Sequence, residues 1–265
     1  MHLMDYHHHT NNSFDSIALM EEICENAIKN KIKEICFTEH FSVNPLAPTY
    51  GHMDFDKYFD EIRYCREKFD TQLTIKAGLE LCEPHLLMDT YKETLQRFTL
   101  DFILGSVHNI NNQKLRLVLK EKGQQAYQLY FEELYQMVSY ADIDVIAHLD
   151  LMKRYAYKEY GLYSFHEYQE VIQQVLKKAI ERNIGIEINT SGLRASLKQA
   201  LPSMKIIQLY KDLGGEILTI GSDSHTADSV GANLNEAYAL AKQCGFKYIY
   251  KFEKRKPLAV KLSGV

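Results

Sequence analysis

Short apolar segments alternate with longer amphipathic segments along the whole chain. The apolar segments predict strands at 2–6, 33–38, 73–79, 101–105, 143–147, 184–188 and 216–220, with a last short strand near 247–252. Between them, apolar residues recur at helical spacing, which predicts helices at 16–30, 56–69, 88–98, 124–141, 164–182, 204–213 and 230–244. In the first helix, Ile17, Met20, Ile23 and Ile28 approximate one apolar face.

Repeated strand–helix units of this kind predict an α/β protein with a parallel sheet closed into a barrel. No Pro/Gly-rich linker interrupts the pattern, so residues 1–265 are expected to form a single domain. A doubly wound open sheet is the alternative, but it normally gathers ligands from two or three strands at one switch point. Here polar residues that bind metals follow six different strands, and that distribution favours a closed ring.

Two predicted connections are long, at 41–54 and 109–123. Both leave the rim that carries the polar residues, so both are expected to be either lids over a site or ordinary surface loops.

The composition narrows the classes of protein without selecting one. The 265 residues carry a formal net charge of −4 with a pI near 6.3, so no basic excess points to nucleic acid. The five cysteines are scattered without CxxC pairs, as is typical of reduced cytosolic thiols. No signal-type start and no apolar run long enough to span a membrane is visible, so we expect a cytoplasmic location. Residues 261–265 carry no structural signal and are expected to be a tail.

Residues of the types that bind metals lie at, or just past, the ends of the predicted strands. They belong to D-Y-H-H-H at 5–9, F-T-E-H at 37–40, G-L-E-L at 78–81, G-S-V-H at 105–108, I-A-H-L at 146–149 and G-S-D-S-H at 221–225, together with an aspartate at 15. The candidates are His7, His9, Asp15, His40, Glu80, His108, His148, Asp223 and His225. In a βα barrel such side chains converge on one rim. Six imidazoles and three carboxylates exceed what one ion can use and predict two or three ions.

Spacing adds detail to this prediction. His7 and His9 are two residues apart, so at a strand end both point to the same side while His8 points away. Asp223 and His225 repeat the arrangement. The mixed nitrogen and oxygen set favours Zn, Mn or Fe without selecting among them.

Other titratable residues have weaker assignments. Asp5, Glu39 and Asp150 stand beside ligands, where they are expected either to accept imidazole N–H groups or to be solvated or salt-bridged. The histidines without matching strand ends are expected to be structural or on the surface; they are His2, His8, His52, His85 and His166.

In order and type, these motifs resemble the polymerase and histidinol phosphatase (PHP) family of metal-dependent phosphoesterases. The resemblance covers nearly the whole chain and implies a distorted seven-stranded (β/α) barrel with its metal site at the carboxyl ends of the strands. Within the family, F-T-E-H-F at 37–41, A-H-L-D-L at 147–151 and N-T-S-G-L-R at 189–194 are most similar to the monofunctional L-histidinol-phosphate phosphatases. One position departs from the pattern, because Asp15 stands where the family often has a histidine.

The resemblance implies three ligand sets. The first comprises His7, His9, Glu80 and Asp223; the second Glu80, His108 and His148; and the third Asp15, His40 and His225. It also implies hydrolysis of a phosphate monoester by a hydroxide that bridges two ions. No Cys-x5-Arg or D-x-D-x-T motif is present, so no phosphoenzyme is expected. Asp223 and His225 are predicted to be catalytic, and His225 is one candidate for the leaving-group acid, a metal-bound water being the other.

The substrate is expected to be a small molecule bound by arginines near the same rim. Arg194, after the sixth strand, is the first candidate for a phosphate clamp through its bidentate fork, with Arg154 and Arg116 as second candidates. Tyrosines at 155–163 are candidates for an aromatic wall.

The resemblance points to L-histidinol phosphate and thus to histidine biosynthesis. The alternatives are a phosphoesterase of the same family that acts on a nucleotide or phosphotyrosine, and a non-catalytic metal-binding module. A membrane partner is not expected, and the sequence does not determine the oligomeric state.

Overall fold

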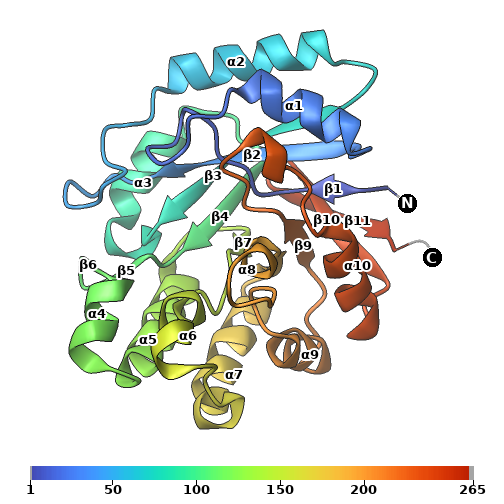
Figure 1. The fold of residues 1–265 in the computed structure, drawn as a ribbon. Helices are drawn as coiled ribbons and strands as arrows, with labels where there is room; N and C mark the ends of the chain where they lie inside the picture. The colour runs from blue at the N-terminus through green and yellow to red at the C-terminus, as the bar shows by residue number, and fades with distance from the viewer. Residues whose placement is uncertain (1, 263–265) are drawn as a thin grey trace.

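Parallel strands form the centre of the fold. The computed structural model describes residues 2–262, and their arrangement is drawn in Figure 1. Within those residues, seven parallel strands form one sheet in the order β1-β2-β3-β4-β7-β8-β9. They are β1 (Met4–Asp5), β2 (Glu34–Phe41), β3 (Thr74–Cys82), β4 (Phe102–Ser106), β7 (Val145–Ile146), β8 (Gly185–Asn189) and β9 (Leu218–Gly221). Each of the seven strands predicted for the parallel sheet is present.

The two ends of the sheet meet, which confirms the predicted barrel over the open sheet. The Tyr6 amide donates to the Ile220 carbonyl at 2.9 Å, and the His9 amide donates to the Ser224 carbonyl at the same distance. These bonds join the segment after β1 to β9. The ring therefore brings the carboxyl ends of all its strands to one rim.

Helices surround the barrel (Figure 1). They are α1 (Met20–Lys29), α2 (Phe55–Lys68), α3 (Met88–Leu95), α4 (Leu115–Lys122), α5 (Gln125–Tyr140), α6 (Met152–Tyr160), α7 (Phe165–Glu181), α8 (Ser191–Arg194), α9 (Met204–Asp212) and α10 (Leu234–Gln243), with short 3-10 turns η1 (Pro84–Leu86) and η2 (Ala227–Ser229). The long helix α7 illustrates how a helix packs against the barrel. Its residues Val171, Val175 and Ala179 recur at every fourth position, and all three are buried. No helix among residues 2–262 has the length and apolar character needed to cross a membrane.

A two-stranded antiparallel hairpin covers the amino-terminal end of the barrel. It comprises β10 (Tyr248–Glu253) and β11 (Lys256–Lys261). The Phe252 ring packs 4.8 Å from the ring of Phe102, and Arg255 forms ion pairs with Asp142 at 2.8 Å and Asp144 at 3.0 Å. The opposite end therefore remains the open rim.

The expectation that residues 261–265 form a tail is wrong for the first two of them. Lys261 lies in β11, and Leu262 is buried. Residues 263–265 lie outside the described part of the chain. The sequence did not reveal β11 because most of its side chains are exposed, so it lacks an apolar pattern.

Local structure differs from the predictions in three other places. The segment at 109–123 is not a plain loop: it holds a small hairpin, β5 (Asn109–Ile110) with β6 (Gln113–Lys114), followed by α4. The helix α6 was not predicted. The first helix begins at Met20, and Ile17 is 91% exposed, so Ile17 does not belong to its buried face.

Candidate metal centre

The nine predicted ligands come together on the rim. His7 and His9 follow β1, His40 lies in β2 and Glu80 lies in β3. Asp15 lies between β1 and α1. The other four follow later strands: His108 follows β4, His148 follows β7, and Asp223 and His225 follow β9. Parallel register explains the convergence, since His40 and Glu80 are direct neighbours across β2 and β3.

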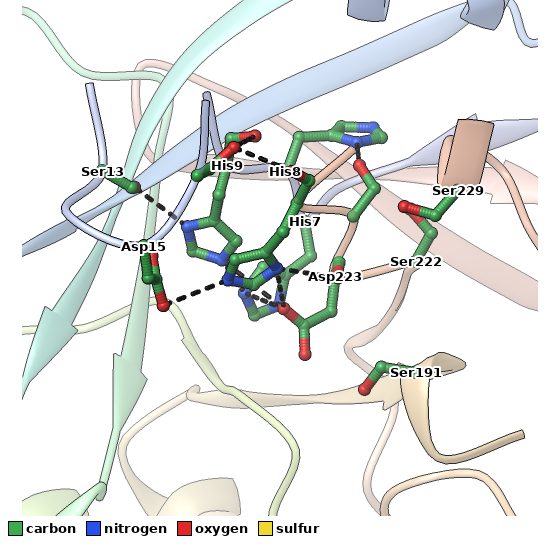
Figure 2. Close-up of polar contacts among 12 residues, drawn as sticks. His7, His8, His9, Ser13, Asp15, Ser191, Ser222, Asp223 and Ser229 are labelled. Carbon is green, nitrogen blue, oxygen red and sulfur yellow. Dashed lines mark hydrogen bonds and ion pairs between the residues drawn. The ribbon is translucent and has the colours of Figure 1, made fainter. Parts of the chain in front are cut away.

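The paired histidines at the end of β1 point as their spacing predicts. The Nε2 atoms of His7 and His9 lie 3.1 Å apart, and each lies within 3.8 Å of Oδ1 of Asp223. Figure 2 shows His8 turned to the opposite side, where its Nδ1 lies 2.6 Å from the Ser224 hydroxyl. The prediction that His8 points away is confirmed.

Glu80 lies at the centre of the cluster, and its two oxygens face different imidazoles. Oε2 lies 3.2 Å from His7 Nε2 and 3.0 Å from His40 Nδ1. Oε1 lies 2.9 Å from His148 Nε2 and 3.6 Å from His108 Nε2. A carboxylate that divides the imidazoles in this way has the geometry of a bridging ligand.

Asp15 joins the third predicted set. Its Oδ2 lies 3.4 Å from His40 Nε2 and 3.3 Å from His225 Nε2. His225 also faces Asp223, with Nδ1 3.5 Å from Oδ1. The aspartate therefore occupies the position expected of a ligand and is not a helix cap, since α1 begins five residues later at Met20.

Hydrogen bonds on the outer side of the rings fix which nitrogens face the centre. His7 Nδ1 lies 2.7 Å from Oε1 of Glu187, a carboxylate that can only accept. His9 Nδ1 lies 3.1 Å from the Ser13 hydroxyl, which itself donates to Glu39 at 2.6 Å. Both Nδ1 atoms must therefore carry a proton, and in each ring Nε2 is the nitrogen that faces the centre and is available to a cation.

This outer layer differs from the expected one. Glu187, which the sequence reasoning missed, contacts a ligand ring directly, whereas Glu39 acts on His9 through Ser13. Asp5 accepts from the backbone of Ser222 and Gly231 and lies 3.4 Å from Nε2 of the non-ligand His8.

Among the described residues, Asp150 makes no hydrogen bond or ion pair with a ligand ring and instead pairs with Lys153 at 2.8 Å. For Asp150 the salt-bridged alternative therefore holds, and Asp5 contacts the backbone and His8 instead of a ligand ring. The available signal for Glu187 was a lone acid inside the apolar strand β8.

Backbone strain is concentrated at the site. His148 has φ 26° and Asp223 has φ 53°, in a region that side chains other than glycine rarely adopt. Gly221, just before this turn, is required by close packing, because a Cβ there would lie 2.2 Å from Glu187 Oε1 and 2.4 Å from His7 Cβ. The fold thus holds these ligands in conformations that the isolated chain disfavours.

The buried charges perturb one another strongly. Burial alone would raise the pKa of Glu80, but His40, His7 and His108 outweigh it and hold that pKa well below its usual range. Burial alone would lower the pKa of His7, but the carboxylates of Glu187, Glu80 and Asp223 raise it well above the usual value. Burial, assisted by His148 and His40, lowers the pKa of His108 to about 3. Ring and carboxylate charges are thus tightly coupled.

The donor set fits divalent transition ions. Among the described residues, five groups of ligand atoms lie within 4.8 Å of one another. They are His7, His9 and Glu80; Glu80, His108 and His148; His9, His40 and His225; His7, His148 and Asp223; and His40, Cys82 and His108. Nδ1 of His148 is buried without a hydrogen-bond partner among the described residues. Converging imidazole nitrogens and the buried carboxylates of Glu80 and Asp223 are costly unless cations compensate the carboxylates. The residues present therefore suit metal ions.

A cavity of about 250 Å³ opens above the cluster. It is lined by Phe14, Asp15, His40, Ala47, Pro48, Thr49, Cys82, His108, Asn109, Lys114, Leu115, Arg116, His148, Arg154, Tyr155, Asp223 and His225. Two residues of the wall, Cys82 and Phe14, were not predicted from the sequence. The sulfur of Cys82 lies 3.9 Å from His40 Nδ1. Both long connections, 41–54 and 109–123, contribute to the wall.

The three arginines occupy different positions. Arg154 lines the cavity: its Nη2 contacts the Ser191 hydroxyl and lies 3.4 Å from Asp223 Oδ2. Arg116 also lines it, stacked 5.2 Å over the Tyr155 ring. Arg194 is not among the described residues that line it, and donates to the carbonyls of Ser222 and Asp223 at 2.6 and 3.3 Å. The geometry therefore places Arg154 ahead of Arg194 as a group facing the cavity.

Of the tyrosines at 155–163, Tyr155 alone is among the described residues of the cavity wall. Tyr163 instead donates to Asp150 at 3.1 Å. The histidines outside the ligand set, within the described part of the chain, do not line the cavity; His85, for example, pairs with Glu133 at 2.9 Å.

Comparison with known proteins agrees with this geometry. The PHP domain family matches residues 5–191. A probable histidinol-phosphatase of Clostridium acetobutylicum is 33% identical over 260 residues, covering 96% of this chain and 98% of the relative. The histidinol-phosphatase of Lactococcus lactis is 28% identical, covering 95% of both chains.

A solved structure is also similar. The histidinol phosphate phosphatase of Lactococcus lactis, crystallised with zinc, L-histidinol and phosphate, superposes with a TM-score of 0.89 at 26% identity and covers 97% of this chain and 98% of its own.

Proposed function

The chain belongs to the PHP domain family, and on that premise we propose that it is a metal-dependent phosphomonoesterase that hydrolyses L-histidinol phosphate to L-histidinol and phosphate. The observation that carries the proposal is the carboxylate of Glu80, buried between two sets of imidazoles beneath a cavity that Arg154 lines. The relatives that match nearly the whole chain carry this activity in their names. We take the chain to be one catalytic domain.

The metal ligands are proposed in the sets that the distances suggest. His7, His9, Glu80 and Asp223 would hold one ion, and Glu80 with His108 and His148 a second. Asp15, His40 and His225 would hold a third. When bound, divalent ions supply Lewis acidity and lower the pKa of water enough to make a nucleophile near neutral pH. Zinc is the first candidate because a similar structure contains it.

The protein's own groups would bind and orient the phosphate. Arg154 lines the cavity, and its Nη2 is held by Asp223 and Ser191. A guanidinium fixed in this way suits a phosphoryl oxygen as a charged donor. Arg116 at the opening adds a second positive charge. Arg194 would act indirectly, by fixing the carbonyls around Asp223.

The leaving alkoxide needs a proton. Burial alone would lower the pKa of His225, but Asp15 and then Asp223 outweigh it and raise the pKa. Without a third ion, His225 would therefore carry a proton at the cavity wall. With a third ion it becomes a ligand, and water must supply the proton.

The outer wall suits a small aromatic alcohol. Phe14 and Tyr155 provide apolar ring surface for an imidazole, and the cavity is too small for a polynucleotide. A net charge of −4 also disfavours a nuclease.

The test is phosphate release by metal-reconstituted protein from L-histidinol phosphate, nucleoside monophosphates, phosphotyrosine and glycerol phosphate. We expect kcat/KM to favour L-histidinol phosphate by at least about tenfold, a difference of about 1.4 kcal/mol. Preference for another monoester would refute the substrate and leave a phosphoesterase, whereas turnover of none would support a metal-binding module.

A further inference from the structure

The N-T-S segment at 189–191 connects the layer beneath the metal ligands to the arginine of the cavity. Asn189 ends β8, and Ser191 begins α8. Asn189 Nδ2 donates to Glu187 Oε2 at 3.1 Å, and Asn189 Oδ1 accepts from the Ser191 amide at 3.0 Å and from its hydroxyl. The Ser191 oxygen in turn accepts from Arg154 Nη2. A continuous hydrogen-bonded chain therefore runs from Glu187 to Arg154.

The chemistry of its two ends fixes the direction of every bond. A carboxylate only accepts and a guanidinium only donates, so the groups between them must each do both. Asn189 must turn its NH₂ to Glu187 and its oxygen to Ser191. The serine proton then points to Asn189, which leaves the lone pairs of its oxygen for Arg154. An asparagine at 189 and a hydroxyl residue at 191 satisfy this order of donors and acceptors. An alanine at either position would interrupt it.

We propose that Asn189 and Ser191 are positioning residues that hold the Arg154 guanidinium beside Asp223, where it meets the phosphoryl group. The inference rests on the proposed function, because it assigns Arg154 to the phosphate. An arginine side chain loses rotamer freedom when it is fixed, and this loss opposes substrate binding if it occurs only on binding. The anchor at Ser191 orders the side chain before the substrate arrives.

The hydrogen bonds of Glu187 connect Ser191 and Arg154 to the metal-ligand candidates. Glu187 is also bound to His7 Nδ1 at 2.7 Å and to the His148 amide at 2.9 Å, and Asp223 completes the loop at Arg154. Figure 2 shows Ser191 on the side of the Asp223 carboxylate. The position of the Arg154 guanidinium is therefore tied by hydrogen bonds to the candidate ligands His7, His148 and Asp223.

The test is a double-mutant cycle on Ser191 and Arg154. Ser191→Ala should lower kcat/KM by on the order of 10-fold or more, as expected for loss of a hydrogen bond to a charged group. In an Arg154→Met background, which keeps the apolar stem, the same change should be nearly silent. Ser191→Thr keeps the hydroxyl and should restore most of the activity. Ser222→Ala is the matched control, because its buried hydroxyl has no partner in the described residues.

Two readouts separate positioning from a structural role. The affinity for inorganic phosphate, measured by calorimetry on the metal-loaded protein, should fall in Ser191→Ala by a factor similar to the loss in kcat/KM. Metal content and the thermal midpoint should remain those of the wild-type protein. An equal cost in both backgrounds, a loss of bound metal, or wild-type phosphate affinity would each overturn the proposal.

The outcome does not depend on the natural substrate. If L-histidinol phosphate is not hydrolysed, the cycle is run on whichever phosphate monoester is turned over, and phosphate binding is measured unchanged. Failure of the proposed function and failure of the positioning role therefore give different results.

Discussion

Replacing Glu187 by glutamine tests how far the outer hydrogen bonds control the metal ligands. Glu187 is 1% exposed and accepts from three donors: His7 Nδ1 at 2.7 Å, the His148 amide at 2.9 Å and Asn189 Nδ2 at 3.1 Å. Glutamine has the same shape but only one accepting oxygen. The substitution therefore changes the hydrogen bonding and the charge while leaving the volume almost constant.

Neither orientation of the glutamine satisfies all the donors. If its oxygen faces His7, its NH₂ meets the donors of His148 and Asn189, and a buried unmatched donor costs about 1–3 kcal/mol. If it is reversed, the NH₂ donates to His7 Nδ1, and the proton moves to Nε2, the atom that should bind the ion. Loss of such an outer partner typically weakens metal binding by about 10- to 100-fold, or about 1.4–2.8 kcal/mol.

The assay is chelator competition, with zinc affinity and stoichiometry measured on the folded variant. Glu34→Gln is the matched control, because Glu34 is also 1% exposed but lies at the other end of the barrel, where Lys251 pairs with it at 3.1 Å. Glu187→Gln should lose affinity and Glu34→Gln should keep it. Wild-type affinity in Glu187→Gln, or an equal loss in both variants, would refute the orienting role.

Three further predictions concern the ligands and the arginines. Glu80→Gln should reduce kcat by orders of magnitude and lower the number of bound ions, since one oxygen of the bridge is lost; elemental analysis beside steady-state kinetics decides this. Asp15→Asn should lower metal stoichiometry while the other two sets stay filled, and unchanged stoichiometry would show that Asp15 is not a ligand. Arg154→Ala should lower kcat/KM by about 10- to 200-fold with metal content unchanged, whereas Arg194→Ala, which frees the carbonyls beside Asp223, should also reduce bound metal.

The convergence of the candidate ligands could be predicted because strand ends are visible in the sequence. An apolar run followed at once by a polar residue, as before Glu80 or His148, marks a rim position in a parallel barrel. The spacing of two at His7 and His9 then sets the direction of the rings. The sequence also supported the closed ring, because ligands followed too many strands for an open sheet.

The outer partners could not be predicted by the same reasoning. Adjacency in sequence suggested Asp5 and Asp150, yet Asp5 accepts from the backbone amide of Ser222 and Asp150 pairs with Lys153. Glu187 reaches His7 from across the sheet, and that proximity depends on ring closure and on the small size of Gly221. Likewise, the position of Arg194 on the short helix α8 did not reveal that its guanidinium turns to backbone carbonyls.

The alternation of side chains along β8 places two residues that support the site on the same face of the strand. In β8, Glu187 and Asn189 face the same side, so one reaches the ring of a rim ligand while the other lies one step closer to the cavity. Glu187 orients the His7 ring, and Asn189 begins the series of hydrogen bonds that ends at Arg154. One strand can thereby orient a metal ligand and a phosphate-binding group together. A change that shifted β8 by a single residue would reverse both side chains and separate the two functions.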